Sequence, residues 1–406
     1  MYLSKNSMKR KILMCLTISI YPFLPIIKEW NVWGGLVIEL LILLFVGMTS
    51  LIKLKNGIAV LALNQYAVML SVLLLVYCFI NIKNTYIAFS GLRTFFLYIF
   101  FYTIENDVDG RSCGIVKTTS YASMAVAAIM SGGCIIQFIY PEIMKTMHNP
   151  MAWDELRAKT DWTPLGIYNR AISFMTDPNV LSVYLAFSLF LTFILFKKEK
   201  RNIYLFFMFF ESVSVVLTQS RTGMFIVVIY MLLSVVMEFI RERHLTWYKT
   251  FVVCLSGLLG LYVLINKLDI ILKFLRVDTL ASGNGRAEKN ILHLNLYFSD
   301  VLKIILGNGL FDGRKIIFEN SYLSIAYMFG IIGSFILLIL ACFLFKDLIK
   351  CENAELLLCY AAVAFVGDYI LIPQITLVVI LCLLANSKIV NLKRRGKDEN
   401  SSNIIT

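Results

Sequence analysis

The chain has 406 residues, of which 59% are hydrophobic and only 16% are charged, and its formal net charge is +12. Soluble globular proteins carry roughly a quarter charged residues, so this composition excludes a soluble domain and indicates an integral membrane protein. Apolar segments near the ~20 residues that a helix needs to cross the hydrocarbon recur along the whole chain. We therefore expect an all-α protein, because helices satisfy their own backbone hydrogen bonds in lipid.

About twelve membrane spans are predicted, forming one polytopic domain over residues 1–390, with a polar cytoplasmic tail at 391–406. In chain order the spans are 12–27, 33–52, 60–80, 86–104, 118–140, 171–196, 202–218, 222–240, 249–266, 321–345, 354–371 and 374–387. Pro22 and Pro25 stand where a secretory signal would carry small residues, so the first span is expected to remain uncleaved. Pro373 predicts a tight turn or a broken helix between the last two spans.

Lysine and arginine collect in every second connection, which predicts that both termini lie in the cytoplasm. The residues that carry this pattern are Lys5, Lys9, Arg10, Lys11, Lys53, Lys55, Lys197, Lys198, Lys200, Arg201, Arg241, Arg243, Lys346, Lys350, Lys393, Arg394, Arg395 and Lys397. Two longer connections then fall on the outer face, a medium loop at 141–170 and a large loop at 267–319. The orientation signal accounts for most of the positive charge, so nucleic acid is not expected as a partner.

The segment LTQSRTGMF, residues 217–225, places a cation between two apolar segments. Gln219, Ser220 and Arg221 are predicted to form an outer turn, and Gly223 allows another backbone or a ligand to come close. An isolated arginine at the membrane interface has an ordinary explanation, because its long side chain can reach lipid phosphates. The alternative is that Arg221 binds an anion.

The large outer loop contains a flexible break at Ser282–Gly285, followed by Arg286. From 287 to 305 apolar residues recur at helical spacing, which predicts an amphipathic helix on the outer surface. The loop closes with Gly307-Asn308-Gly309, and a membrane helix is expected to begin at Asn320 or Ser321.

The order of these pieces resembles the Wzy-type polysaccharide polymerases and the related O-antigen ligases. The pieces are Asp177-Pro178-Asn179, Ser220-Arg221-Thr222-Gly223, Gly285-Arg286, Gly307-Asn308-Gly309, Glu319-Asn320, and the spaced glycines Gly330 and Gly333. Each is weak alone, whereas their common order over residues 160–345 is more specific. The resemblance implies a GT-C-like helical fold in the bacterial cytoplasmic (inner) membrane.

The resemblance also implies a reaction, the transfer of a growing glycan from undecaprenyl pyrophosphate to a sugar hydroxyl at the outer face. The expected catalytic residues are Arg221 and Arg286, as phosphate ligands, and Glu319, which stands where family members commonly carry a proposed histidine base. A carboxylate can accept a proton from a hydroxyl. The alternative for Glu319 is a cap on the helix that begins at Ser321. No metal and no cofactor are expected.

Four residues are secondary candidates for substrate binding: Arg93, Arg170, Asn179 and Asn320. For the two arginines, contact with lipid headgroups is the competing explanation. His148 in the medium outer loop is a candidate for stacking on a sugar ring.

Several other functions remain open from the sequence. A ligase would use the same donor with a different terminal acceptor, and a flippase would transport the lipid-linked oligosaccharide, although two uneven outer loops argue against a transporter built from repeats. A metal-dependent glycosyltransferase would need acidic ligands in its outer loops, and a scaffold would need no ordered arginines. The expected partners are the lipid-linked oligosaccharide as donor and acceptor, membrane lipids and a chain-length regulator.

Overall fold

The computed structural model describes residues 11–12, 14–55, 112–152, 170–242, 291, 294–295, 298, 300–307, 320–345, 353–367, 369 and 372–386. Within these residues the chain consists of helices and turns without any strand, as the predicted all-α class requires. The predicted spans 60–80, 86–104 and 249–266 lie outside the described residues, as do most of the loop 267–319 and the tail 391–406.

Ten longer helical segments and several short ones make up the described residues. The first comprises residues 14–20 and leads into the 3-10 turn η1 (Tyr21–Phe23), and the last comprises residues 373–386. Between them lie α2 (Leu24–Trp30), α3 (Val32–Lys55), α6 (Ser112–Ile139), α9 (Pro178–Glu199), α10 (Ile203–Leu217), α11 (Arg221–Glu242), α17 (Ser321–Phe345) and α18 (Ala354–Val366). The short elements are α7 (Ile143–Met147), η3 (Pro150–Ala152) and α16 (Val301–Leu306).

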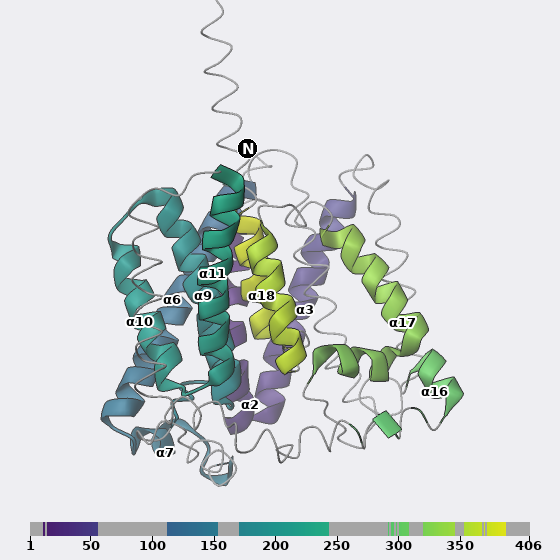
Figure 1. The fold of residues 1–406 in the computed structure, drawn as a ribbon. Helices are drawn as coiled ribbons and strands as arrows, with labels where there is room; N and C mark the ends of the chain where they lie inside the picture. Colours follow the sequence, from purple (N-terminus) through teal and green to yellow (C-terminus); the bar gives the residue numbers. More distant parts are fainter. Residues whose placement is uncertain are drawn as a thin grey trace, which may run out of the picture.

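Helix α9 is the centre of the bundle and packs against α6, α10 and α11 (Figure 1). Its side chains are buried almost throughout, and the Phe190 ring stacks on Tyr230 of α11 with centroids 3.9 Å apart. Helix α10 lies outside α9 and exposes Phe206 and Phe209. Helices apolar on both their inner and outer faces suit a lipid environment, since lipid accepts the outward side chains.

Three described helices are long and apolar enough to cross a membrane, Gly114–Ile139, Pro178–Glu199 and Ser321–Ile339. Shorter apolar helices accompany them, among them Ile203–Leu217 and Arg221–Ser234. The described part is therefore a helical membrane protein by composition and length. The full set of twelve spans stays a prediction.

Three of the predicted spans differ in extent or continuity from the observed helices, and a fourth helix is kinked. The predicted span 171–196 begins as a helix only at Pro178, because the Asp177 side chain accepts hydrogen bonds from the Asn179 and Val180 amides and caps it. Pro22 and Pro25 break the predicted span 12–27 into a helix, a 3-10 turn and α2. The predicted span 354–371 ends at Val366, and α17 is kinked at Gly330, where φ is 62°.

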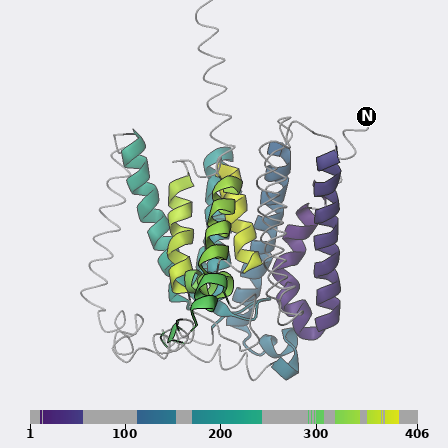
Figure 2. The ribbon, with the colours of Figure 1, turned by 90° about the vertical axis from the view of Figure 1, so that its right-hand side faces the viewer.

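The connections divide between two ends of the bundle. Helices α2, α7 and α16 lie at the lower end in Figure 1, and the view in Figure 2 places the same end below. The starts of α9 and α11 share this end with α2 and α7, since hydrogen bonds tie Asn149 to Glu29, His148 to Ser173 and Ala171 to Leu217. The basic connection at 197–201, between α9 and α10, therefore lies at the opposite end.

Candidate functional site

Arg170 joins the starts of α9 and α11. Its Nε donates to the Thr218 carbonyl oxygen at 2.9 Å, and one terminal nitrogen donates to Asn179 Oδ1 at 2.7 Å. The residue is only 6% exposed, so both hydrogen bonds form away from bulk solvent. Charge-assisted hydrogen bonds of this kind are short and strong. Two predicted binding residues, Arg170 and Asn179, are thus brought together.

The turn between α10 and α11 completes this arrangement. Ser220 Oγ donates to Asn179 Oδ1 at 3.1 Å, and the Ser220 amide donates to Thr218 Oγ1 at 3.3 Å. Gln219 has φ of 50°, a left-handed conformation that reverses the chain in three residues. The Ala171 amide also donates to the Leu217 carbonyl at 3.1 Å. We call Arg170, Asn179, Thr218 and Ser220 the arginine junction.

Arg221 is the first residue of α11 and follows the arginine junction directly. It was predicted to belong to the turn and instead opens the helix, with the Met224 amide bonded to the Ser220 carbonyl at 3.2 Å. Its side chain is half-buried. A helix start carries a partial positive charge, so an arginine there gains nothing from the helix dipole. Guanidinium and first-turn amides together favour an anion instead.

Gly223 lets α11 approach α9 at Ser182, as the sequence predicted for another backbone. A Cβ atom on Gly223 would fall 1.6 Å from Ser182 Oγ and 3.0 Å from the Ser182 carbonyl carbon. No side chain fits in this space. The glycine therefore sets how closely the two helices pack immediately above the arginine junction.

Asn320 caps α17 and ties it to α18. Its Oδ1 accepts hydrogen bonds from the Tyr322 amide at 2.9 Å and the Leu323 amide at 3.1 Å. Its Nδ2 donates to the Phe365 carbonyl at 3.2 Å, while Ser321 Oγ donates to the Gly367 carbonyl at 2.8 Å. Asn320 thus has a structural task at the helix start, beside any part in substrate binding.

Two motif glycines contact each other. Gly307 (φ 79°) ends α16, and Gly330 (φ 62°) lies at the kink of α17. A Cβ atom on Gly330 would lie 2.3 Å from the Gly307 nitrogen, and one on Gly307 would lie 2.3 Å from the Met328 carbonyl oxygen. Only glycine adopts these angles readily with such close backbone contact. Helix α16 is thereby held against α17 at this point.

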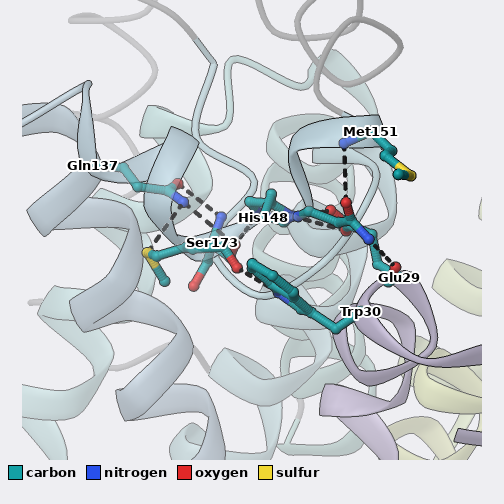
Figure 3. A network of polar contacts seen from close by, with 8 residues as sticks. Glu29, Trp30, Gln137, His148, Met151 and Ser173 are labelled. Carbon is teal, nitrogen blue, oxygen red and sulfur yellow. Dashed lines mark hydrogen bonds and ion pairs between the residues drawn. The ribbon is translucent and has the colours of Figure 1, made fainter.

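Sequence reasoning missed a buried polar network at the same end of the bundle (Figure 3). His148 Nδ1 lies 2.9 Å from Glu29 Oε2, and its Nε2 lies 3.0 Å from the Ser173 carbonyl oxygen. The Asn149 amide donates to Glu29 Oε1 at 2.7 Å. Gln137 Oε1 accepts from the Ser173 amide at 2.8 Å. We call Glu29, Gln137, His148, Asn149 and Ser173 the His148 clasp.

His148 is 0% exposed, so the hypothesis that it stacks on a sugar ring is wrong. Both ring nitrogens are engaged within the clasp and no face of the ring is open to solvent. A lone histidine in a polar loop gave no hint of these contacts, because its partners lie 119 and 25 residues away.

Three of the predicted site residues, Arg93, Arg286 and Glu319, lie outside the described residues. Their placement relative to the arginine junction stays a prediction. Among the predicted residues that are described, hydrogen bonds join Arg170, Asn179 and the turn before Arg221. Asn320 lies instead at the start of α17 and is bonded to α18.

Comparison with protein-family models, with curated proteins and with solved structures found no match. The interpretation of the site therefore uses its geometry and the sequence resemblance.

Proposed function

We propose that the chain is a polysaccharide polymerase that transfers a growing glycan from undecaprenyl pyrophosphate to a sugar hydroxyl of a lipid-linked repeat unit. One observation carries the proposal: Arg170, Asn179 and Ser220, from three separate segments, share hydrogen bonds directly before Arg221. The motifs that carry the resemblance to Wzy-type polymerases thus include residues that meet in space. Capsule, O-antigen or exopolysaccharide synthesis is the class of process that uses such a reaction.

The reaction requires the site to neutralise the negative charge of the departing pyrophosphate. The acceptor hydroxyl oxygen forms a bond to the anomeric carbon, the bond from that carbon to the pyrophosphate oxygen breaks, and the pyrophosphate leaves with the electron pair. Arginine suits a leaving diphosphate because its planar fork binds two oxygens and keeps its charge. In this proposal Arg221 and Arg286 bind the pyrophosphate, and Arg170 and Asn179 hold the start of α11 in place for it.

The proton of the acceptor hydroxyl needs a base, and Glu319 is the proposed one. The competing role for Glu319, capping α17, requires first-turn amides of that helix. Asn320 Oδ1 already accepts hydrogen bonds from two of them, Tyr322 and Leu323. This occupancy favours the proton-accepting role.

The proposed location is the bacterial cytoplasmic membrane, with both termini in the cytoplasm. The arginine junction and the basic residues Lys197, Lys198, Lys200 and Arg201 lie at opposite ends of α9. Basic connections mark the cytoplasmic side of membrane proteins, so the arginine junction would face outward. A donor lipid in the outer leaflet presents its pyrophosphate at that level. A chain-length regulator is the further protein partner we propose.

The test is polymerisation by the purified protein in lipid nanodiscs supplied with lipid-linked repeat units. Arg221→Lys keeps the charge and loses the two-pronged contact, so we expect polymerisation to fall about a hundredfold, the usual effect of losing a donor aimed at developing charge. Product length is read by gel electrophoresis and mass spectrometry. Arg201→Lys makes the same substitution at the other end of the bundle and is expected to leave the rate unchanged.

Two results would overturn the proposal. Wild-type protein that forms no glycosidic bond with any lipid-linked repeat unit would remove the polymerase activity. Polymer of wild-type length and yield from Arg221→Lys would show that Arg221 does not belong to the site. A single transfer to a terminal acceptor, without chain growth, would identify a ligase instead.

A further inference from the structure

The hydrogen bonds of the His148 clasp need two hydrogens on the imidazole–carboxylate pair. A neutral imidazole and an ionised carboxylate carry only one between them, so the clasp holds one additional proton. Nε2 faces the Ser173 carbonyl oxygen, which only accepts, so this nitrogen carries a hydrogen. Nδ1 faces Glu29 Oε2 at 2.9 Å, and a hydrogen must lie between these atoms as well. Without it, two acceptors would stand at contact distance in a buried site, which is costly.

We propose that the His148 clasp is a proton-dependent lock that positions Arg170. The proton shared by His148 and Glu29 keeps the lock closed, and its removal opens it. Each of the three connections that the lock joins is held at a definite atom: the end of α2 at Glu29, the segment after α7 at His148 and the segment before α9 at Ser173 (Figure 3). The positioning role rests on the proposed function, whereas the lock itself does not.

The lock reaches Arg170 through three consecutive residues. The Ile172 and Ser173 amides both donate to Gln137 Oε1, at 3.1 and 2.8 Å. The Ala171 amide donates to the Leu217 carbonyl at 3.1 Å. Ser173 has φ of 48°, a conformation that its surroundings must hold, and its Oγ donates to the Met130 carbonyl at 2.8 Å. Release of the Ser173 carbonyl by His148 therefore loosens the segment that presents Arg170.

The other charged groups on the packed elements are engaged elsewhere. Lys28, beside Glu29 on α2, pairs with Glu39 of α3. Arg170 donates to Thr218 and Asn179. Glu142, on the connection that carries His148, is exposed. Glu29 is thus the charged group that the described residues present to the imidazole, and the pair controls the proton.

The variant Glu29→Gln distinguishes an effect of the shared proton from an effect of side-chain packing. A glutamine at this position can accept from the Asn149 amide through its oxygen and donate to a neutral His148 Nδ1 through its nitrogen. The variant keeps every contact without the shared proton. Protonation of His148 would then set two donors against each other, so the pH dependence should reverse in sign.

Hydrogen exchange in the full-length protein measures the lock directly. In the wild type, protection of the Asn149, Ile172 and Ser173 amides, corrected for intrinsic rates, should be about tenfold lower in alkaline than in acidic buffer, because loss of the shared proton breaks the hydrogen bonds of the clasp. Glu29→Gln should show no such fall and should instead be less protected in acidic than in alkaline buffer. His148→Ala should be poorly protected throughout. A fall in Glu29→Gln that parallels the wild type would overturn the lock.

Polymerisation kinetics test the positioning role separately. As the lock opens, KM for the lipid-linked donor should rise about tenfold in the wild type, with a smaller change in kcat, and Glu29→Gln should not follow. If the exchange pattern holds while the wild type forms no glycosidic bond, the proposed function fails and the lock stands. If the protein polymerises and Glu29→Gln shares the wild-type pH profile, the positioning role is overturned.

Discussion

The two ends of α9 both carry basic residues and use them in opposite ways. At its end, the Glu199 carboxylate is the more enclosed group, reached by Lys117 at 3.0 Å, Arg201 at 3.8 Å and two tyrosine hydroxyls, and the Arg201 side chain is 70% exposed. At its start the buried group is a cation, Arg170, held by a carbonyl and an amide oxygen. In the proposed topology the exposed cations mark the cytoplasmic side, whereas the buried arginine joins the starts of α9 and α11.

The largest expected difference between the two ends of α9 is in the effect of replacing their arginines, Arg170 and Arg201. Arg170→Ala removes two buried charge-assisted hydrogen bonds, so the free energy of unfolding should fall by about 3 kcal/mol or more. Arg201→Ala removes an exposed contact and should change it by less than about 0.5 kcal/mol. Thermal denaturation of both variants in detergent compares them. Equal midpoints for the two variants would show that the ends do not differ.

The close packing beside the arginine junction provides a second test. Gly223→Ala places a methyl group against Ser182 and should destabilise the protein by about 2 kcal/mol, because the two helices must separate. Gly132→Ala in α6 is the matched control, since its Cβ meets no atom within 4 Å, and alanine stabilises a helix by up to about 1 kcal/mol. Denaturation midpoints that shift the same way in both variants would contradict this account.

The smallest expected effect concerns the start of α17. Asn320→Ala removes the cap on the Tyr322 and Leu323 amides and should cost about 1 kcal/mol. Asn320→Asp keeps the accepting oxygen and loses the donor to Phe365, so it should retain most of the stability. A fall in polymerisation for Asn320→Asp, with its thermal midpoint retained, would indicate a substrate contact. Equal activity of Asn320→Asp and wild type would leave Asn320 a purely structural residue.

Local signals in the sequence predicted the features that depend on neighbouring residues. The helical class follows from composition, and Asp177-Pro178 is recognisable afterwards as a helix start, which the predicted span 171–196 overlooked because its apolar residues continue across the boundary. Gly223 was predicted to permit close approach, and α9 is the element that approaches.

Contacts between distant residues were beyond the sequence. Nothing in the surroundings of His148 identifies Glu29 as its partner, and the meeting of Gly307 with Gly330 depends on how α16 folds back on α17. Thr218 contributes its backbone carbonyl to the arginine junction. Because every residue has such a carbonyl, the identity of the side chain gives no signal for this contact. Arg170 and Asn179 were named from the sequence, but not as partners, because a hydrogen bond across nine residues depends on an irregular segment between them.

The length of α10 has a consequence for the membrane around the protein. At 1.5 Å per residue its 15 residues measure about 22 Å, less than the ~30 Å thickness of the hydrocarbon. Since three residues then lead directly into α11, Arg221 has no slack with which to reach a more distant surface. In the proposed topology, the bilayer thins beside this pair of helices or the arginine lies below the average headgroup plane. Either way, the lipid diphosphate of the proposed reaction would reach the guanidinium while its hydrocarbon tail stays immersed.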